Sequence, residues 1–232
     1  VLLSFMLSTE LYLNSCFDKY LKGKICPTRE TLRTKSNWEG GYPLDSQEDS
    51  QSYTEWAGYH GTSLQSAEQI VVSNYRISEA DNDWLGNGAY FFISGFTDPI
   101  ENAVNWARFR SWDRQARKRK YNRYAVLRSL IRTESHLDLD DIDDLIRFNK
   151  IREKLAQRMK QEGYGDASAL QNDCFVANFA LQNLNLDALV RRDAITMQRG
   201  QLKARIPNCR IMCLKEPTRC AIKHDIVTKG SI

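Results

Sequence analysis

Apolar residues recur along most of the chain at spacings that distinguish helices from strands. Residues 63–72 carry apolar side chains every three or four positions, which predicts a helix capped by Ser63 or Thr62. Asp98-Pro99 is a typical helix start. The spacing therefore predicts helices at residues 63–72, 98–107, 140–161 and around 176–181.

Short apolar runs between these segments predict strands. The run AYFFI at residues 89–93 follows a glycine-rich turn and is typical of a buried strand. Further strands are predicted at residues 57–62, 125–131, 191–197, 209–214 and 221–227. Short strands separated by helices and long turns predict an α+β domain over residues 56–232.

The first 55 residues show a different pattern of apolar and polar positions from the rest of the chain. Residues 5–22 show apolar spacing compatible with a helix. Residues 27–55 are polar and interrupted by proline and glycine, which predicts an irregular segment. Two interpretations stay open for it: a loop over a binding pocket, or a disordered connection between the helix and the main domain.

The composition bears on where the protein resides and on whether it binds a metal. Apolar residues make up 42% of the chain and charged residues 27%, which is typical of globular proteins. No apolar run is long enough to cross a bilayer, and no secretory signal pattern is visible. The six cysteines lack the paired spacing of a zinc site, which favours buried free thiols over metal binding. We therefore expect a cytoplasmic protein without a membrane segment or a metal site.

Three segments carry residue types that suit a flat ring bearing an amide. Gly61 directly follows His60, and a residue without a Cβ lets a ligand bond the backbone N–H and C=O. The imidazole of His60 offers a ring nitrogen to a hydroxyl. Tyr90 and Trp106 each offer an aromatic face for stacking. Taken one at a time, such residues are common in ordinary turns and cores.

The order of these segments is more specific than any one of them. The sequences YHGT at 59–62, WLGNGAYF at 84–91 and AVNWA at 103–107 resemble the poly(ADP-ribose)-polymerase and diphtheria-toxin-like ADP-ribosyltransferases. They are most similar to bacterial stand-alone members with a Trp-Leu-Gly-x-Gly-x-Tyr-Phe signature. The resemblance covers residues 57–110 closely and extends weakly to about residue 225. It implies an ADP-ribosyltransferase-like split antiparallel β-sheet core with flanking helices, and NAD as the donor of ADP-ribose.

The resemblance also implies roles at the first segment. His60 would bond the adenosine ribose of NAD and count among the catalytic residues. Gly61 would hold the nicotinamide amide through its backbone, and Thr62 would border the same end. The sequence contains no dinucleotide-binding Gly-x-Gly-x-x-Gly, so NAD would be bound without a Rossmann unit.

At the second and third segments the resemblance implies an aromatic sandwich. Tyr90, also among the catalytic residues, and Trp106 would enclose the nicotinamide ring. Trp106 stands in place of the usual second tyrosine of the family. Ala103 stands where many relatives have a serine that helps to hold the amide, so that contact would be missing.

The family's late catalytic glutamate is absent from its usual place. The corresponding stretch is TMQRG at residues 196–200, which puts Gln198 at the catalytic position, with Arg199 if the register slips. Three explanations stay open: a natural replacement, an engineered inactivating change, or a carboxylate elsewhere, with Glu216 and Glu162 as candidates. Loss of one charged stabiliser typically costs about 10²–10³ in rate. NAD binding is therefore expected more firmly than turnover.

The charge distribution bears on the acceptor. Residues 108–128 contain nine Lys or Arg and one acid, interleaved with aromatic side chains, which suits nucleic acid. A protein acceptor fits the same charges. A solvated face is also possible, paired with the five Asp of residues 138–144 within the fold or with an acidic partner. The candidate acceptor-binding residues are Arg117, Lys118, Arg119 and Lys120.

The leading hypothesis is an NAD-dependent mono-ADP-ribosyltransferase that modifies a protein or nucleic acid. The resemblance alone suggests a bacterial toxin or phage-defence effector, with a cognate antitoxin as a further partner to be sought. One alternative is a catalytically silent NAD-binding module in which Gln198 is natural. Another is a nucleic-acid-binding protein that kept the fold and lost the pocket.

Overall fold

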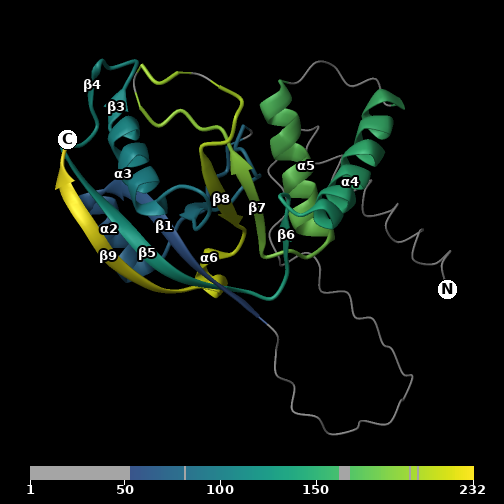
Figure 1. Cartoon of the computed structure of the whole chain (residues 1–232), viewed down its shortest axis with the longest axis horizontal. Coiled ribbons are helices and arrows are strands. Elements are labelled where there is room, and N and C mark those ends of the chain that lie inside the picture. Colours follow the sequence, from purple (N-terminus) through teal and green to yellow (C-terminus); the bar gives the residue numbers. More distant parts are fainter. Residues whose placement is uncertain (1–52, 81, 162–167, 199, 203) are drawn as a thin grey trace, which may run out of the picture. The chain divides into compact units, whose positions relative to one another are not determined.

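A computed structural model of the chain describes residues 53–80, 82–161, 168–198, 200–202 and 204–232 (Figure 1). The helix expected at residues 5–22 lies outside these ranges, as does nearly all of the irregular segment that follows it. The first described strand begins at Thr54. The proposed unit of residues 1–55 therefore stays a prediction.

A mostly antiparallel sheet of seven strands organises the described residues, as expected for an α+β domain. The strand order is β6-β7-β8-β2-β1-β5-β9, and only the β6–β7 pair is parallel. The strands are β1 (Thr54–Ser63), β2 (Ala89–Ile93), β5 (Arg123–Thr133), β6 (His136–Asp138), β7 (Ala188–Asp193), β8 (Cys209–Leu214) and β9 (Ala221–Ser231). A separate hairpin pairs β3 (Trp112–Asp113) with β4 (Lys118–Arg119). The helices are α2 (Leu64–Ser73), α3 (Pro99–Arg110), α4 (Ile142–Gln161), α5 (Ala169–Asn183) and α6 (Pro217–Cys220).

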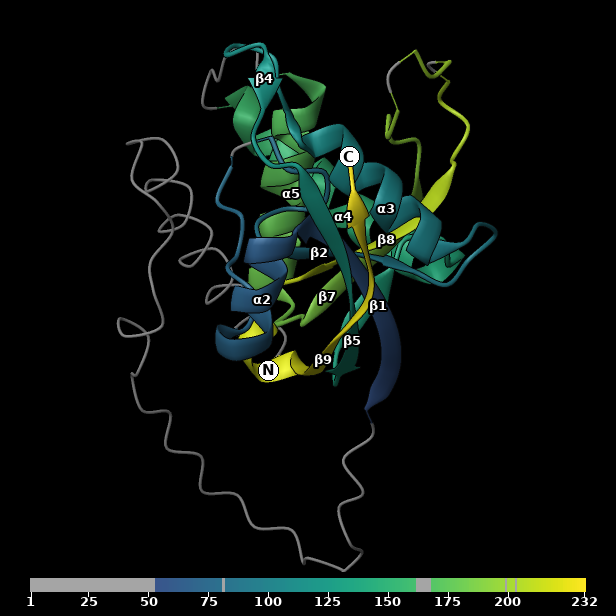
Figure 2. The ribbon, with the colours of Figure 1, turned by 90° about the vertical axis from the view of Figure 1, so that its left-hand side faces the viewer.

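Each face of the sheet has its own hydrophobic core. Successive residues of a strand point to opposite faces, so Phe91 packs with Ala67 of α2, and Phe92 packs with Ala103 of α3. The second core continues to α5 through Leu181. Figure 2 shows α2 and α3 on either side of the strands. The central strands are therefore buried on both faces.

Local signals in the sequence predict most element boundaries. Ser63 caps α2 by accepting the Ser66 N–H, and Asp98 caps α3 by accepting the Ile100 N–H. The strands predicted at 89–93 and 209–214 are confirmed residue for residue. The strand predicted at 191–197 was wrong in position, since β7 occupies 188–193 and places three fully buried residues in the sheet.

The cysteines within the described residues are free thiols. Cys174, Cys209, Cys213 and Cys220 are all buried, which confirms the expectation for these four. Cys16 and Cys26 lie outside the described residues. No helix in the described part of the chain combines the length and the apolar character needed to span a membrane.

Candidate functional site

A cavity opens where β1 and β2 separate. Their register contains Gly58↔Ile93 and Tyr59↔Phe92, whereas β1 stays paired with β5 along its whole length to Ser63. The cavity has a volume of about 990 Å³ and is lined by both strands, by α2, by the loop before β2, and by two residues of α3. This volume lies at the upper end of the range for ligand pockets, about 300–1,000 Å³.

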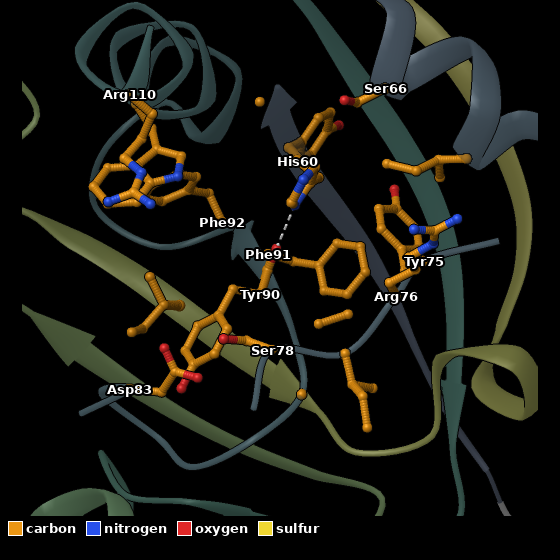
Figure 3. A pocket seen from close by; sticks show the side chains of 18 of the residues that line it. His60, Ser66, Tyr75, Arg76, Ser78, Asp83, Tyr90, Phe91, Phe92 and Arg110 are labelled. Atoms are coloured by element: carbon orange, nitrogen blue, oxygen red, sulfur yellow. Dashed lines mark hydrogen bonds between the residues drawn. The ribbon is translucent and has the colours of Figure 1, made fainter. Parts of the chain in front are cut away.

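His60 spans the gap between the two strands (Figure 3). Its Nδ1 lies 2.8 Å from the backbone oxygen of Tyr90. A carbonyl oxygen only accepts, so Nδ1 carries the proton. Burial lowers the pKa of His60, and the bond to Tyr90 opposes this only in part. The ring is therefore neutral at pH 7, and Nε2 is a hydrogen-bond acceptor.

Gly61 lies where α3 packs tightly against β1. A Cβ at this position would lie 1.8 Å from the backbone oxygen of Ala103, so only glycine fits. Gly61 also lines the cavity, whereas Ala103 is fully buried behind it. Thr62 pairs with Ala125 of β5 and does not line the cavity. A glycine was expected here because of a ligand, but the packing of α3 on β1 already requires it.

Tyr90 is fixed by two backbone groups of the turn before its strand. Its hydroxyl donates to the Gly86 oxygen at 2.6 Å and accepts the Leu85 N–H at 2.7 Å. Burial strongly raises the pKa of Tyr90, so the phenol stays protonated. Its ring is thus held in one orientation at the cavity.

Trp84 is a site residue to which sequence reasoning assigned no role. Its ring makes edge contacts with Tyr90, at 6.0 Å between centroids, and with Trp106, at 5.3 Å. It therefore links the two rings expected to form the sandwich. The signal was present, because Trp84 opens the WLGNGAYF segment at 84–91, but its contact with Trp106 depends on the tertiary fold.

Charged side chains of both signs also line the cavity. Arg76 and Arg110 contribute two cations, and Figure 3 shows them well apart. The Arg110 guanidinium lies 5.4 Å from the centre of the Trp106 ring. Asp83 is the acidic residue among the described lining residues. The cavity thus offers cations for a phosphate group, together with one carboxylate.

Gln198 lies at a second hollow on a neighbouring face of α3. This hollow has a volume of about 400 Å³ and also contains Phe109, Trp112 and Arg119. Gln198 is exposed there and is not among the residues lining the larger cavity. The ring of Phe109 stacks on that of Trp106, with 6.0 Å between centroids, and so connects the two sites.

The structure places neither alternative to Gln198 from the sequence analysis at the cavity within the described residues. Glu216 precedes α6, where its carboxylate lies 3.7 Å from Arg219, and it does not line the cavity. Glu162 and Arg199 lie outside the described residues. Asp83 is therefore the carboxylate that the structure adds to the candidates.

The acidic run at residues 138–144 finds its partners elsewhere than in the basic run. Arg210 on β8 forms ion pairs with Asp138 and Asp140, and Arg192 lies 3.2 Å from Asp140. Within the described ranges, no carboxylate forms an ion pair with the cations of residues 108–128. Among the described residues, the acidic run and the basic run therefore do not pair with each other.

Comparison with known proteins gives little guidance on function. No protein-family model matches the chain. The uncharacterized protein MJ0359 of Methanocaldococcus jannaschii is 31% identical over 125 residues, which covers 48% of this chain and 55% of the relative. The chain thus spans about half the length of the curated relative that it matches, and that name states no activity.

Proposed function

We propose that the cavity binds NAD and that the protein transfers ADP-ribose from it to a macromolecule, as a mono-ADP-ribosyltransferase with an ADP-ribosyltransferase-like fold. One observation carries this proposal. His60, Tyr90 and Trp106 come from three separate motif segments, and all line the cavity where β1 and β2 diverge. A role as a bacterial toxin or phage-defence effector rests on the sequence resemblance alone.

The lining groups match the parts of NAD. The Tyr90, Trp84 and Trp106 rings suit a flat nicotinamide, and the Gly61 backbone suits its amide. The Nε2 acceptor of His60 suits a ribose hydroxyl. Arginine side chains bind the oxygens of a diphosphate well, so one of the two lining arginines, Arg76 or Arg110, would hold that group. Contacts from these separate lining groups would let the cavity bind NAD without a glycine-rich Rossmann turn.

The proposed reaction breaks the N-glycosidic bond of NAD. Nicotinamide leaves with the bonding electron pair, and an oxygen or nitrogen of the acceptor forms the new bond to ribose C1′ and loses its proton to solvent. Positive charge develops on the ribose, and a nearby carboxylate stabilises it. Asp83 can supply that carboxylate from the cavity wall, whereas Gln198 at the neighbouring hollow carries no charge.

The first experiment measures NAD binding through intrinsic tryptophan fluorescence, because Trp84 and Trp106 line the cavity. We expect saturable quenching, and a loss of affinity of roughly tenfold in His60→Ala and in Trp106→Ala. The control is His136→Ala. The ring of His136 packs on Trp56 at 5.1 Å, and His136 does not line the cavity. Absence of NAD binding would overturn the proposal.

A second experiment measures release of nicotinamide in the presence of cell extract. Asp83→Asn is expected to lower the rate by about 10²–10³ if Asp83 supplies the charge. An increase in Gln198→Glu would instead assign the catalytic position to residue 198. Binding of NAD without any release would favour the silent NAD-binding module, the alternative that the sequence left open.

A further inference from the structure

The β3–β4 hairpin presents a dense set of exposed cations. Its described residues include the exposed side chains Arg114, Arg117, Lys118, Arg119 and Lys120. The acidic residue of this segment, Asp113, already has partners within the turn. Its carboxylate accepts the backbone N–H groups of Ala116 and Gln115, and these bonds together with neighbouring lysines lower its pKa. The hairpin therefore keeps a strong positive charge for an outside partner.

The hollow beside the hairpin has the chemistry of a nucleobase site. Phe109 and Trp112 contribute aromatic rings, and successive bases stack readily on such rings. Asn105 and Gln198 contribute side-chain amides, each with donors and an acceptor that can read the edge of a base. Rings, amides and adjacent cations are the combination found in single-strand nucleic-acid sites.

We propose that this hollow and the β3–β4 hairpin bind single-stranded nucleic acid, with a base in the hollow and phosphates along the hairpin. An acidic protein would satisfy the cations equally well. It would make no use of the aromatic rings and amides of the hollow, which therefore favour nucleic acid. Gln198 belongs to this nucleic-acid site in the proposal, as a residue that contacts the base.

The position of the hollow makes the bound strand a suitable acceptor, and this step rests on the proposed function. Phe109 lines the hollow and stacks on Trp106, which lines the cavity. Arg110, at the end of α3, also lines the cavity, and its neighbour Phe109 faces the hollow. A strand seated on the hairpin would thus lie next to the aromatic end of the cavity, where the nicotinamide is proposed to leave.

Binding is tested with short fluorescently labelled RNA and DNA strands in the absence of NAD. Fluorescence anisotropy should show affinity that falls at least tenfold between about 50 and 200 mM salt. The variant Arg117→Glu/Lys118→Glu/Lys120→Glu should bind at least about tenfold more weakly at low salt. Arg119 is left unchanged because it also donates to the backbone of Ile232.

A matched control reverses the same amount of charge elsewhere. Lys150, Arg152 and Lys154 are exposed on α4, and Lys150→Glu/Arg152→Glu/Lys154→Glu should bind the strands at least several-fold more tightly than the hairpin variant. Equal losses in the two variants would show a general charge effect and overturn the proposal. Binding that is absent, or insensitive to salt, would overturn it as well. The difference between the affinities for the RNA strand and the DNA strand shows which of the two nucleic acids the site prefers.

The contribution of the bases has its own test. A strand with abasic positions keeps every phosphate, and we expect it to bind roughly tenfold more weakly than the ordinary strand. Gln198→Ala should change the preference among homopolymers, whereas Gln157→Ala, at an exposed position of α4, should not. Equal binding of abasic and ordinary strands would overturn the placement of a base in the hollow.

Transfer is then followed with labelled NAD, total protein and RNA. Strand binding without NAD binding would sink the proposed function and leave this inference standing. Label that enters protein alone, with no affinity for either strand, would sink this inference and leave the proposed function standing. Label that enters nucleic acid only when the hairpin is intact supports both.

Discussion

The two sites on α3 are built in different ways. The cavity at the β1–β2 divergence is held by buried groups whose hydrogen bonds leave little freedom, such as His60 on Tyr90. The hollow beside the hairpin is formed by exposed, long side chains, among them Arg108, Arg119 and Gln198. The cavity is therefore shaped before any ligand arrives, whereas the hollow takes its shape from flexible side chains.

The largest expected effect comes from adding a methyl group at the wall of the cavity. Gly61→Ala would place a Cβ 1.8 Å from the Ala103 oxygen, which forces α3 away from β1. We expect a loss of about 3 kcal/mol or more in the free energy of unfolding, measured by urea denaturation.

The matched change beside the hollow is Gly200→Ala. Gly200 has a φ of +74° but no heavy atom within 4 Å of an added Cβ. The expected loss is therefore about 1 kcal/mol, from backbone strain alone. Equal losses at Gly61 and Gly200 would contradict the contrast between a packed wall and an open loop.

A smaller effect is expected from removing one hydroxyl at the cavity and one just after the hairpin. Tyr90→Phe removes the hydroxyl that bonds both the buried Gly86 oxygen and the Leu85 N–H, which should cost about 2–3 kcal/mol of unfolding free energy. Tyr121→Phe removes a single bond to the Ala107 oxygen and should cost about 1 kcal/mol. A larger loss at Tyr121 than at Tyr90, again by urea denaturation, would contradict this ranking of the two hydroxyls.

The smallest effect concerns pH. Burial lowers the pKa of His60 below its ordinary value of 6.5, so below that pH the unfolded chain takes up a proton that the folded chain resists. Stability should be full above pH 6.5 and fall with acidification, by at most about 1.4 kcal/mol per pH unit for this group. Burial also lowers the pKa of His224, against a small opposing effect of Asp225.

Urea denaturation across this pH range checks the assignment. His60→Gln should flatten the slope more than His224→Gln, because the His60 ring is the more deeply buried of the two. A slope that survives both substitutions would show that other groups cause it. The described residues of the hollow contain no histidine, so this pH dependence should belong to the cavity side.

Local chemistry made much of this fold predictable. A capping serine, an Asp-Pro helix start and a glycine-bounded apolar run each specify a boundary through contacts a few residues apart. The motif order also predicted that His60, Gly61 and Tyr90 would lie around one cavity. Thr62 and Ala103 were expected beside them and line no part of it.

Long-range contacts account for what the sequence did not reveal. The β3 and β4 strands are two residues each, too short for an alternating pattern. The acidic run at 138–144 pairs with Arg210, some seventy positions along the chain, and nothing local marks that partner. Gln198 was assigned by register in a loop, and loops follow no periodicity that fixes where a side chain points.

The strand pairing that frames the cavity also constrains when it can form. β1 pairs Thr54 with Thr133 on β5, and β2 pairs Ala89 with Leu214 on β8. Such distant pairings require closure of long loops, which slows folding compared with a protein built from local contacts. A nascent chain emerging from the ribosome therefore has one wall of its cavity unsupported until β8 is synthesised.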